Sequence, residues 1–293
     1  MREPAVAGMF YPGSSKGLKR ELRDCFRKGP SRSEPGRGRK VRGLISPHAG
    51  YAYSGPTAAF GFLALADGGM PETAIIIGPN HTGMGKNIGI LNEDMKTPIG
   101  VMSVDKELAH AMGGHYDELS HLREHSMEVQ LPFLQYFSEN MKQICISVGH
   151  PVRKGPWTSE EDAELEQAKE IAGMVAKAVK ETGRDVCIIA SSDFTHCGLN
   201  YGLPVPADMN AGEFARSRDL PVIDSIVEKD VEGALKKKRD LGTTACGMGP
   251  IASTMLALKE LGGYDAELLD YRTSYDVSPS HSAVGYASIV FYG

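Results

Sequence analysis

Short, nearly continuous apolar runs alternate along the chain with longer segments in which apolar residues recur every three or four positions. Apolar runs of about four to eight residues are typical of strands covered on both faces, and the longer periodic segments are typical of helices. The runs that predict strands are 41–46, 73–78, 87–91, 143–149, 185–191, 266–271 and 283–291. The segments that predict helices are 16–28, 56–66 with Pro56 in its first turn, 105–113, 126–138, 159–181, 221–238 and 250–261.

This alternation predicts an α/β fold, with one three-layer α/β/α domain over residues 1–293 and a mostly parallel or mixed central sheet. A chain of 293 residues with 41% apolar residues can bury one large core. The stretch 29–39 is rich in Gly, Pro, Ser and Arg and predicts a loop between the N-terminal helix and the first core strand.

The charge balance argues against a nucleic-acid-binding protein. The net charge is -5 with a pI near 6.0, whereas affinity for nucleic acid rests on clustered Lys and Arg. The two basic clusters, at 37–42 and 236–239, are short and are interpreted as solvated faces. No apolar run approaches the roughly 18 residues that span a bilayer, and the first residues lack a signal-peptide pattern. We therefore expect a cytoplasmic protein that is not membrane-bound.

The five cysteines show no paired spacing such as C-x-x-C, which predicts reduced thiols. Cys145 and Cys187 stand inside aliphatic runs and are expected to be buried and inert. Cys246 stands just before Gly249-Pro250, which opens an apolar helix. A helix N-terminus lowers the pKa of a nearby thiol, so Cys246 is predicted to be a metal ligand or nucleophile, with a packed, unreactive thiol as the alternative.

The candidate functional residues directly follow the predicted strands. Strand 41–46 leads to His48, strand 73–78 leads to His81, and strand 185–191 leads to Asp193 and His196. In open α/β sheets, ligands bind beyond the carboxyl ends of the strands. One histidine in such a place is usually a capping group, but three at equivalent exits favour a shared functional site.

The remaining histidines have weaker signals. In "REHSMEVQLPF", His125 and Glu128 are three residues apart, so Glu128 could orient an imidazole, or both could belong to an amphipathic helix. His281 precedes a strand, which puts it at the opposite edge of the sheet if that strand is parallel and at the same edge if it is antiparallel. Four others are expected to be surface or turn residues: His110, His115, His121 and His150.

Several of these segments together resemble one known family. "ISPHAGYAYSG", "GPNH", "EHSMEVQLPF", "SSDFTH" and "CGMGPI" are similar, in order and spacing, to segments of the Memo family, whose fold is similar to the class III extradiol dioxygenases (LigB-like). The similarity runs from "AGMFYPG" to the last strand. It implies His48, His81 and Cys246 as metal ligands, with Asp193 and His196 beside them. It also implies iron or copper as the metal, with zinc as a further candidate.

Three functions are compatible with this resemblance. The first is a metal-dependent, dioxygenase-like oxidoreductase that acts on a small aromatic or phenolic molecule, with His196 as acid/base and Asp193 as its partner. The second is a zinc-dependent hydrolase. The third is a non-catalytic module that binds a phosphorylated or aromatic ligand. The resemblance also implies a radical-SAM protein as a pathway partner.

The expected cysteine sets this chain apart from extradiol dioxygenases. Those enzymes hold Fe(II) with two histidines and a carboxylate, and here a thiolate is expected in the place of the carboxylate. A thiolate is a softer ligand that can itself be oxidised, so it favours Cu(I), iron or zinc.

Overall fold

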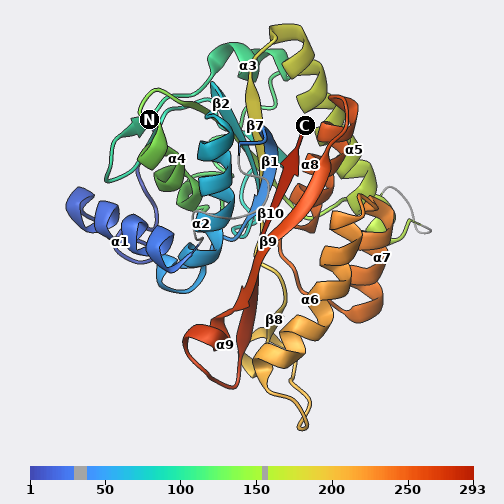
Figure 1. Cartoon of the computed structure of the whole chain (residues 1–293). Helices are drawn as coiled ribbons and strands as arrows, with labels where there is room; N and C mark the ends of the chain where they lie inside the picture. The colour runs from blue at the N-terminus through green and yellow to red at the C-terminus, as the bar shows by residue number, and fades with distance from the viewer. Residues whose placement is uncertain (30–37, 154–157) are drawn as a thin grey trace.

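A computed structural model describes residues 1–29, 38–153 and 158–293 and is built around one mixed sheet (Figure 1). The strand order is β3-β6-β2-β7-β1-β10-β8, and β9 pairs with β10. The central strands β6, β2, β7 and β1 are parallel, whereas β3, β8 and β9 pair antiparallel with their neighbours and β10 is antiparallel to β1. The bounds are β1 Val41–Ser46, β2 Thr73–Pro79, β3 Ile88–Ile90, β6 Lys142–Val148, β7 Val186–Ser191, β8 His196–Cys197, β9 Asp265–Thr273 and β10 Ala283–Tyr292.

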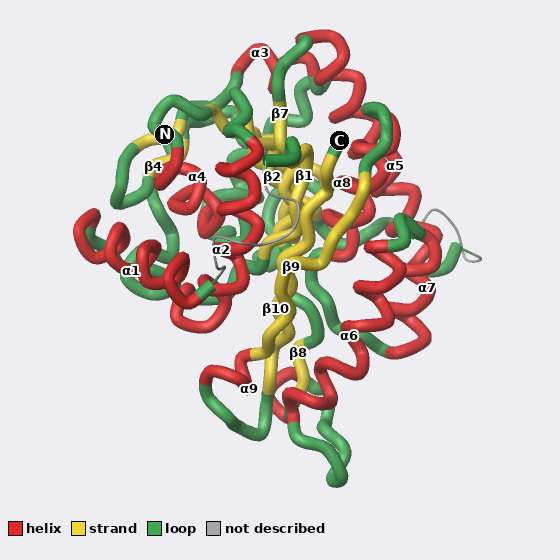
Figure 2. The backbone as a smooth tube through the Cα atoms, viewed as in Figure 1, coloured by secondary structure: helices red, strands yellow, loops and turns green. Residues whose placement is uncertain are grey.

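Helices cover both faces of this sheet, which gives the predicted three-layer α/β/α arrangement (Figure 2). The helices on one face are α1 Ser15–Lys28, α2 Tyr51–Gly68 and α4 Leu131–Phe137, the last preceded by the short helix η1 Glu128–Gln130. The other face carries α3 Lys106–Ala111, α5 Glu160–Thr182, α6 Ala211–Val227, α7 Val231–Leu241 and α8 Met248–Glu260. The shorter elements are η2 Leu199–Tyr201, α9 Ser274–Val277 and the separate pair β4 Met95–Lys96 and β5 Val101–Met102.

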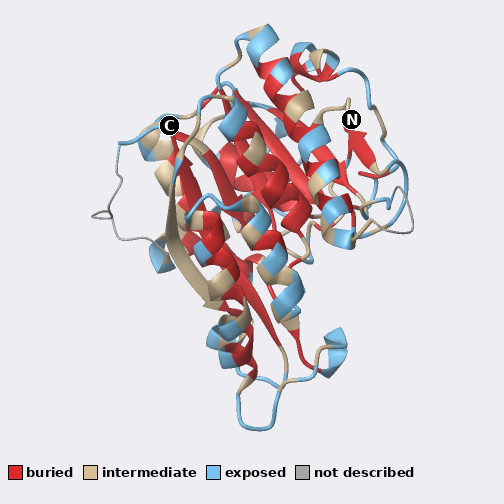
Figure 3. Ribbon diagram, turned by 90° about the vertical axis from the view of Figure 1, so that its right-hand side faces the viewer, coloured by how far each residue is buried: buried red, intermediate tan, exposed pale blue. Residues whose placement is uncertain are grey.

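The apolar runs form strands with two buried faces because alternate side chains point to opposite sides. In β2, Ile75 and Ile77 belong to the core under α5 and α8, whereas Ala74 and Ile76 belong to the core under α2. The central strands consequently form the buried middle layer of the molecule, whereas β9 at the edge is only partly buried (Figure 3). Cys145 and Cys187 lie in this layer without exposed surface, as predicted, and all five cysteines are free thiols.

Two helices begin earlier than the sequence predicts. The helix predicted from Pro56 begins at Tyr51, because the ring of Tyr51 is buried and its hydroxyl donates to the carbonyl oxygen of Val129 at 2.6 Å. Pro56 therefore lies inside α2. The helix predicted over 221–238 is two helices, α6 and α7, and α6 begins after Asn210 because Asn210 and Glu213 form a capping box.

The break between α6 and α7 lies at residues 228–230. Lys229 has a φ of 67°, and the side chain of Asp230 caps the next helix by accepting from the N–H of Gly233 at 2.9 Å. A left-handed residue followed by a capping Asp ends one helix and starts another. The predicted single helix is therefore wrong at this point.

The charged and flexible segments add little to the fold. Of the loop predicted at 29–39, residues 30–37 lie outside the described residues, and so does Arg37 of the first basic cluster. Among the described basic side chains of the two clusters, Lys40 pairs with Asp185 and Lys238 pairs with Glu164. Within the described ranges, no helix is both long and apolar enough to cross a membrane.

Candidate functional site

His48 follows β1 at the carboxyl edge of the sheet and is almost fully buried. Its Nδ1 lies 2.9 Å from the Oγ of Ser191, the last residue of the neighbouring strand β7. The Ser191 hydroxyl donates its only proton to the carbonyl oxygen of Ser126 at 2.6 Å, so toward His48 it acts as an acceptor. Nδ1 of His48 therefore carries the proton, and Nε2 keeps its lone pair.

His81 follows β2 and is oriented by Glu124. Its backbone N–H and its Nδ1 reach the two carboxylate oxygens of Glu124 at 2.6 and 2.9 Å. This contact places the proton of His81 on Nδ1 and leaves Nε2 as its free nitrogen. Burial would raise the pKa of Glu124, but the hydrogen bond and charge of His81, and the N–H of Ser126, lower it to about 2. Glu124 is thus a permanent carboxylate behind the imidazole.

His125 completes a group of three imidazoles. Its ring stacks on that of His81 at 4.7 Å between centroids and meets that of His48 edge-on at 5.5 Å. One nitrogen from each of the three rings lies within 4.8 Å of the others. This spacing is slightly wider than it would be around one bound ion, since metal–nitrogen bonds to Zn²⁺ are about 2.0–2.1 Å long.

Burial keeps His48 and His125 in the form that binds metals. Burial lowers the pKa of His48 well below its usual value, and the neighbouring His81 and His125 add to the effect. Burial also lowers the pKa of His125. A neutral imidazole with a free nitrogen is the metal-binding form, so the donor set fits a metal ion.

Cys246 contacts the free nitrogen of His48. Its Sγ is 3.2 Å from Nε2 of His48 and 3.6 Å from the carbonyl oxygen of Asp193, and of the three imidazoles a contact with Cys246 is recorded only for His48. The sequence predicts a lowered thiol pKa at the start of α8, but burial, together with the nearby Asp193 carboxylate, raises it. That expectation is wrong because desolvation outweighs the field of the helix terminus.

Asp193 and His196 lie at the same edge. Oδ1 of Asp193 accepts the backbone N–H of His48 at 2.8 Å, and burial raises the pKa of this carboxyl group. The backbone of His196 is tied to Thr244, whose Oγ accepts its N–H at 2.8 Å. Within the described ranges, no hydrogen bond joins Asp193 to His196, so the orienting role of Asp193 stays a prediction.

A cavity of about 600 Å³ opens in front of the imidazoles. Four aromatic side chains and four serines contribute to its wall, together with His48, His81, His125, Asp193 and His196. The aromatic residues are Phe10, Tyr53, Tyr201 and Tyr286, and the serines are Ser274, Ser278, Ser280 and Ser282. No Lys or Arg is among its described lining residues, so the wall suits a neutral ligand better than a phosphorylated one.

Three further positions can be compared with the sequence expectations: Glu128, His121 and His281, for which the sequence leaves the edge of the sheet open. Glu128 does not orient an imidazole but pairs with Arg2 at 2.6 Å. The orienting role that the sequence predicts for Glu128 belongs to Glu124, which contacts His81. His121 lies in a turn but is buried, because its Nε2 reaches the carbonyl oxygen of Gly89 at 2.9 Å. His281 lies at the same edge as the site, because β10 is antiparallel to β1.

Asp219 anchors the segment that carries His196, and its raised pKa predicts that the stability of the fold depends on pH. It accepts the N–H of Thr195 at 3.0 Å and the hydroxyl of Tyr271 at 2.6 Å. Burial raises its pKa from 3.8 to about 6, so the folded protein binds this proton more tightly than the unfolded chain does. The resulting stabilisation is present below about pH 4 and is lost as the pH rises to about 6.

Asp219→Asn removes this titration. Between pH 4 and 6, wild type should lose about 3 kcal/mol of unfolding free energy relative to the variant. Urea denaturation of both proteins at several pH values measures the difference, and the comparison cancels titrations that they share. Parallel pH profiles would contradict the expectation.

Comparison with known proteins finds relatives that match nearly the whole chain. The profile of the family described as Memo-like protein matches residues 2–290. A MEMO1 family protein of Methanothermobacter thermautotrophicus is 38% identical, with 99% of each chain covered. Relatives with the same description are 41% identical in Methanosarcina acetivorans, with 99% of this chain and 98% of the relative covered, and 40% identical in Nitrosopumilus maritimus, with 99% of each covered. The chain therefore belongs to the Memo family.

Proposed function

We propose that this protein is a metal-dependent oxidoreductase, with a fold like that of the class III extradiol dioxygenases, that acts on a small neutral aromatic or phenolic molecule. One observation supports it above the others: Sγ of Cys246 lies 3.2 Å from Nε2 of His48, and His48 and His81 line the same aromatic-walled cavity. Such a set with an open side is typical of metal centres that take a further ligand.

Different residues of the site have different roles in this proposal. His48 and His81 are the first two ligands, each held in one tautomer by Ser191 and Glu124. Cys246 is the third ligand for iron or copper, since a thiolate is a soft donor. A bound iron or copper ion would supply the redox chemistry with O₂.

The cavity wall favours a neutral phenol. The aromatic side chains offer ring faces for stacking, and the serines offer hydroxyl groups for a polar substituent. His196 lines the same cavity, where its ring can accept a proton from a ligand hydroxyl. A phosphorylated ligand would find no cationic side chain among the described lining residues.

A metal analysis after anaerobic purification tests the proposal. Wild type should contain iron or copper and consume O₂ with a catechol or phenol. His48→Ala and His81→Ala should lose the metal, whereas the control His110→Ala, an exposed residue of α3, should keep it. Metal-free wild type with no O₂ consumption after reconstitution would refute the oxidoreductase.

Asp193→Asn separates metal binding from turnover. Asparagine can still accept the N–H of His48 through its Oδ1, so metal content should stay near that of wild type. Loss of the carboxylate charge should reduce turnover and shift its pH profile, because His196 would lose a nearby anion. Metal analysis and pH-rate profiles of both proteins measure these effects. Complete metal loss would instead make Asp193 a ligand.

A zinc-dependent hydrolase is the second candidate, and His125 is the observation that favours it. Three histidines and one open position are the ligand set of catalytic zinc in several enzymes. With His125 as third ligand, the site would need no thiolate. Zinc in the purified protein, together with hydrolytic activity that does not depend on O₂, would support this candidate.

A further inference from the structure

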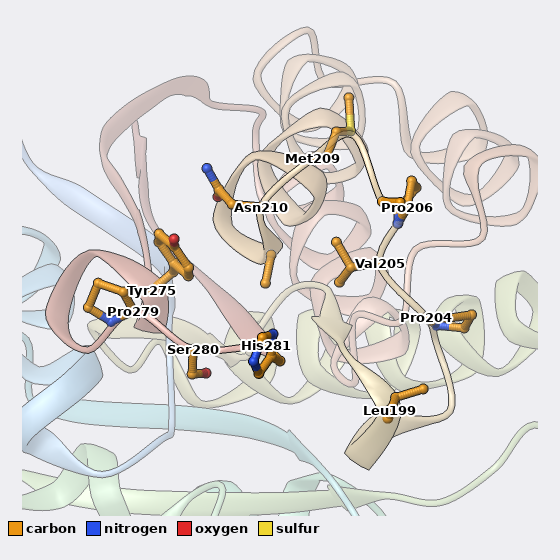
Figure 4. A pocket seen from close by; sticks show the side chains of 12 residues that line it. Leu199, Pro204, Val205, Pro206, Met209, Asn210, Tyr275, Pro279, Ser280 and His281 are labelled. Atoms are coloured by element: carbon orange, nitrogen blue, oxygen red, sulfur yellow. The ribbon is translucent and has the colours of Figure 1, made fainter.

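A second cavity, of about 630 Å³, lies next to the one that contains the imidazoles. Residues 199–211 form one side of it and residues 275–281 the other (Figure 4). In this view Val205 lies across the cavity from Tyr275 and Pro279. Its described lining contains no Asp, Glu, Lys or Arg, and apolar side chains and prolines predominate.

The two cavities are the two sides of one thin partition. Within residues 278–282, Ser278 and Ser282 line the imidazole cavity, whereas Pro279 and His281 line the second one. Ser280 lines both. This alternation is that of an extended segment with opposite faces, and Ser280 lies between the two cavities.

In two neighbouring elements, α9 and η2, the residues are also divided between the two cavities. In α9, Ser274 faces the imidazole cavity and Tyr275 the second one. In η2, Tyr201 faces the imidazole cavity and Leu199 the second one. Three of the four serines therefore lie only on the metal-binding side, and the other side is mainly apolar.

The apolar side is poorly covered by the chain itself. Leu199 is 87% exposed and Met209 is 42% exposed, although both line the second cavity. Contiguous exposed apolar surface that adjoins a binding site is typical of a place for the apolar part of the ligand. The described lining contains no Asp, Glu, Lys or Arg, so a hydrocarbon chain fits it better than a charged group.

We propose that the ligand of the imidazole cavity carries an apolar tail and that this tail lies in the second cavity. The inference rests on the proposed function, because it takes the head group to be a phenol. The substrate class is then an alkyl-substituted phenol, with its ring at the imidazoles and its chain crossing the partition beside Ser280.

A homologous series of 4-alkylphenols, from 4-methyl- to 4-butylphenol, tests this by calorimetric titration of the purified protein. Each added methylene should tighten binding about two- to fourfold, which gives about 10- to 60-fold over the series. Met209→Asp and Leu199→Asp should flatten this dependence on chain length and leave the affinity for phenol itself unchanged. Both side chains are exposed, so neither change should impair folding.

Val101→Asp is the matched control, since Val101 is 46% exposed but lies in β5, away from both cavities. It should keep the wild-type dependence on chain length. If phenol binds but the wild-type series is flat, the tail site is refuted and the proposed function stands. If no member of the series binds, the phenolic ligand itself is refuted. A monomer–dimer shift in Met209→Asp, measured by light scattering, would overturn the tail site in favour of an interface between copies.

Discussion

Glu128→Ala is expected to destabilise the protein by about 3–5 kcal/mol, because it removes one partner of a buried ion pair. The side chains of Glu128 and Arg2 are 0% and 4% exposed, and Oε2 of Glu128 lies 2.6 Å from Nη1 of Arg2. The same carboxylate accepts the N–H groups of Ala5 and Val6 and the hydroxyl of Tyr11. The substitution leaves a guanidinium and these donors buried without their acceptor.

Urea denaturation measures this loss, and the exposed pair of Glu3 and Lys96 supplies the control. Their side chains are 62% and 46% exposed at 3.1 Å, so Glu3→Ala should cost no more than about 1 kcal/mol. Glu128→Gln, which keeps the shape of the side chain, should fall between the two. A loss below about 1 kcal/mol in Glu128→Ala would mean that water replaces the carboxylate around Arg2.

The position of this ion pair links stability to the site. Glu128 holds residues 2–11 against the segment that carries Glu124 and His125, and Arg2 also donates to the carbonyl oxygen of Glu124. Phe10, within the anchored N-terminal segment, packs on the ring of His125 at 4.7 Å. Loosening residues 2–11 therefore also removes support from the third imidazole.

The sequence predicts the sheet and two of the three imidazoles because both follow from local patterns. Continuous apolar runs mark β1, β2 and β7, and the carboxyl ends of parallel strands share one edge. His48 and His81 follow two of these strands directly, so their meeting could be expected without knowledge of any loop.

The rest of the site depends on contacts that no local pattern encodes. Glu124 and His125 belong to an irregular segment over residues 117–125, which has neither strand nor helix periodicity. The spacing of His125 and Glu128 predicts Glu128 as the carboxylate that orients an imidazole. This is the wrong carboxylate, because Glu128 binds Arg2, which is far away in the sequence. Ser191, which fixes the tautomer of His48, is the last residue of an apolar strand and gave no polar signal.

Topology limited the prediction in the same way. Because β10 is antiparallel to β1, His281 and the serines near it lie at the same edge of the sheet as the site. An apolar run in a sequence does not indicate whether its strand pairs parallel or antiparallel. The pKa of Cys246 likewise depends on its burial, which the expected helix terminus alone did not reveal.

Replacement of Cys246 or His125, the two candidates for the third ligand, is expected to have the largest effect on metal binding. Cys246→Ala should weaken copper and iron binding by more than about 100-fold, since changes around a ligand cost about 10- to 100-fold and removal of a ligand should exceed that range. Zinc binding should survive in this variant, because His48, His81 and His125 still supply three imidazoles.

His125→Ala should show the reverse pattern. If zinc is held by the three imidazoles, zinc affinity should fall by more than about 100-fold, whereas copper, held by His48, His81 and the thiolate, should be retained. Competition titrations against a chelator give both affinities for each protein. Cys197→Ala is the matched control, because Cys197 is a buried thiol that contacts the carbonyl oxygen of Ala211 and lies outside the imidazole group. Unchanged copper affinity in Cys246→Ala would exclude the thiol as a ligand, and the site would then rest on three histidines, as the zinc hydrolase requires.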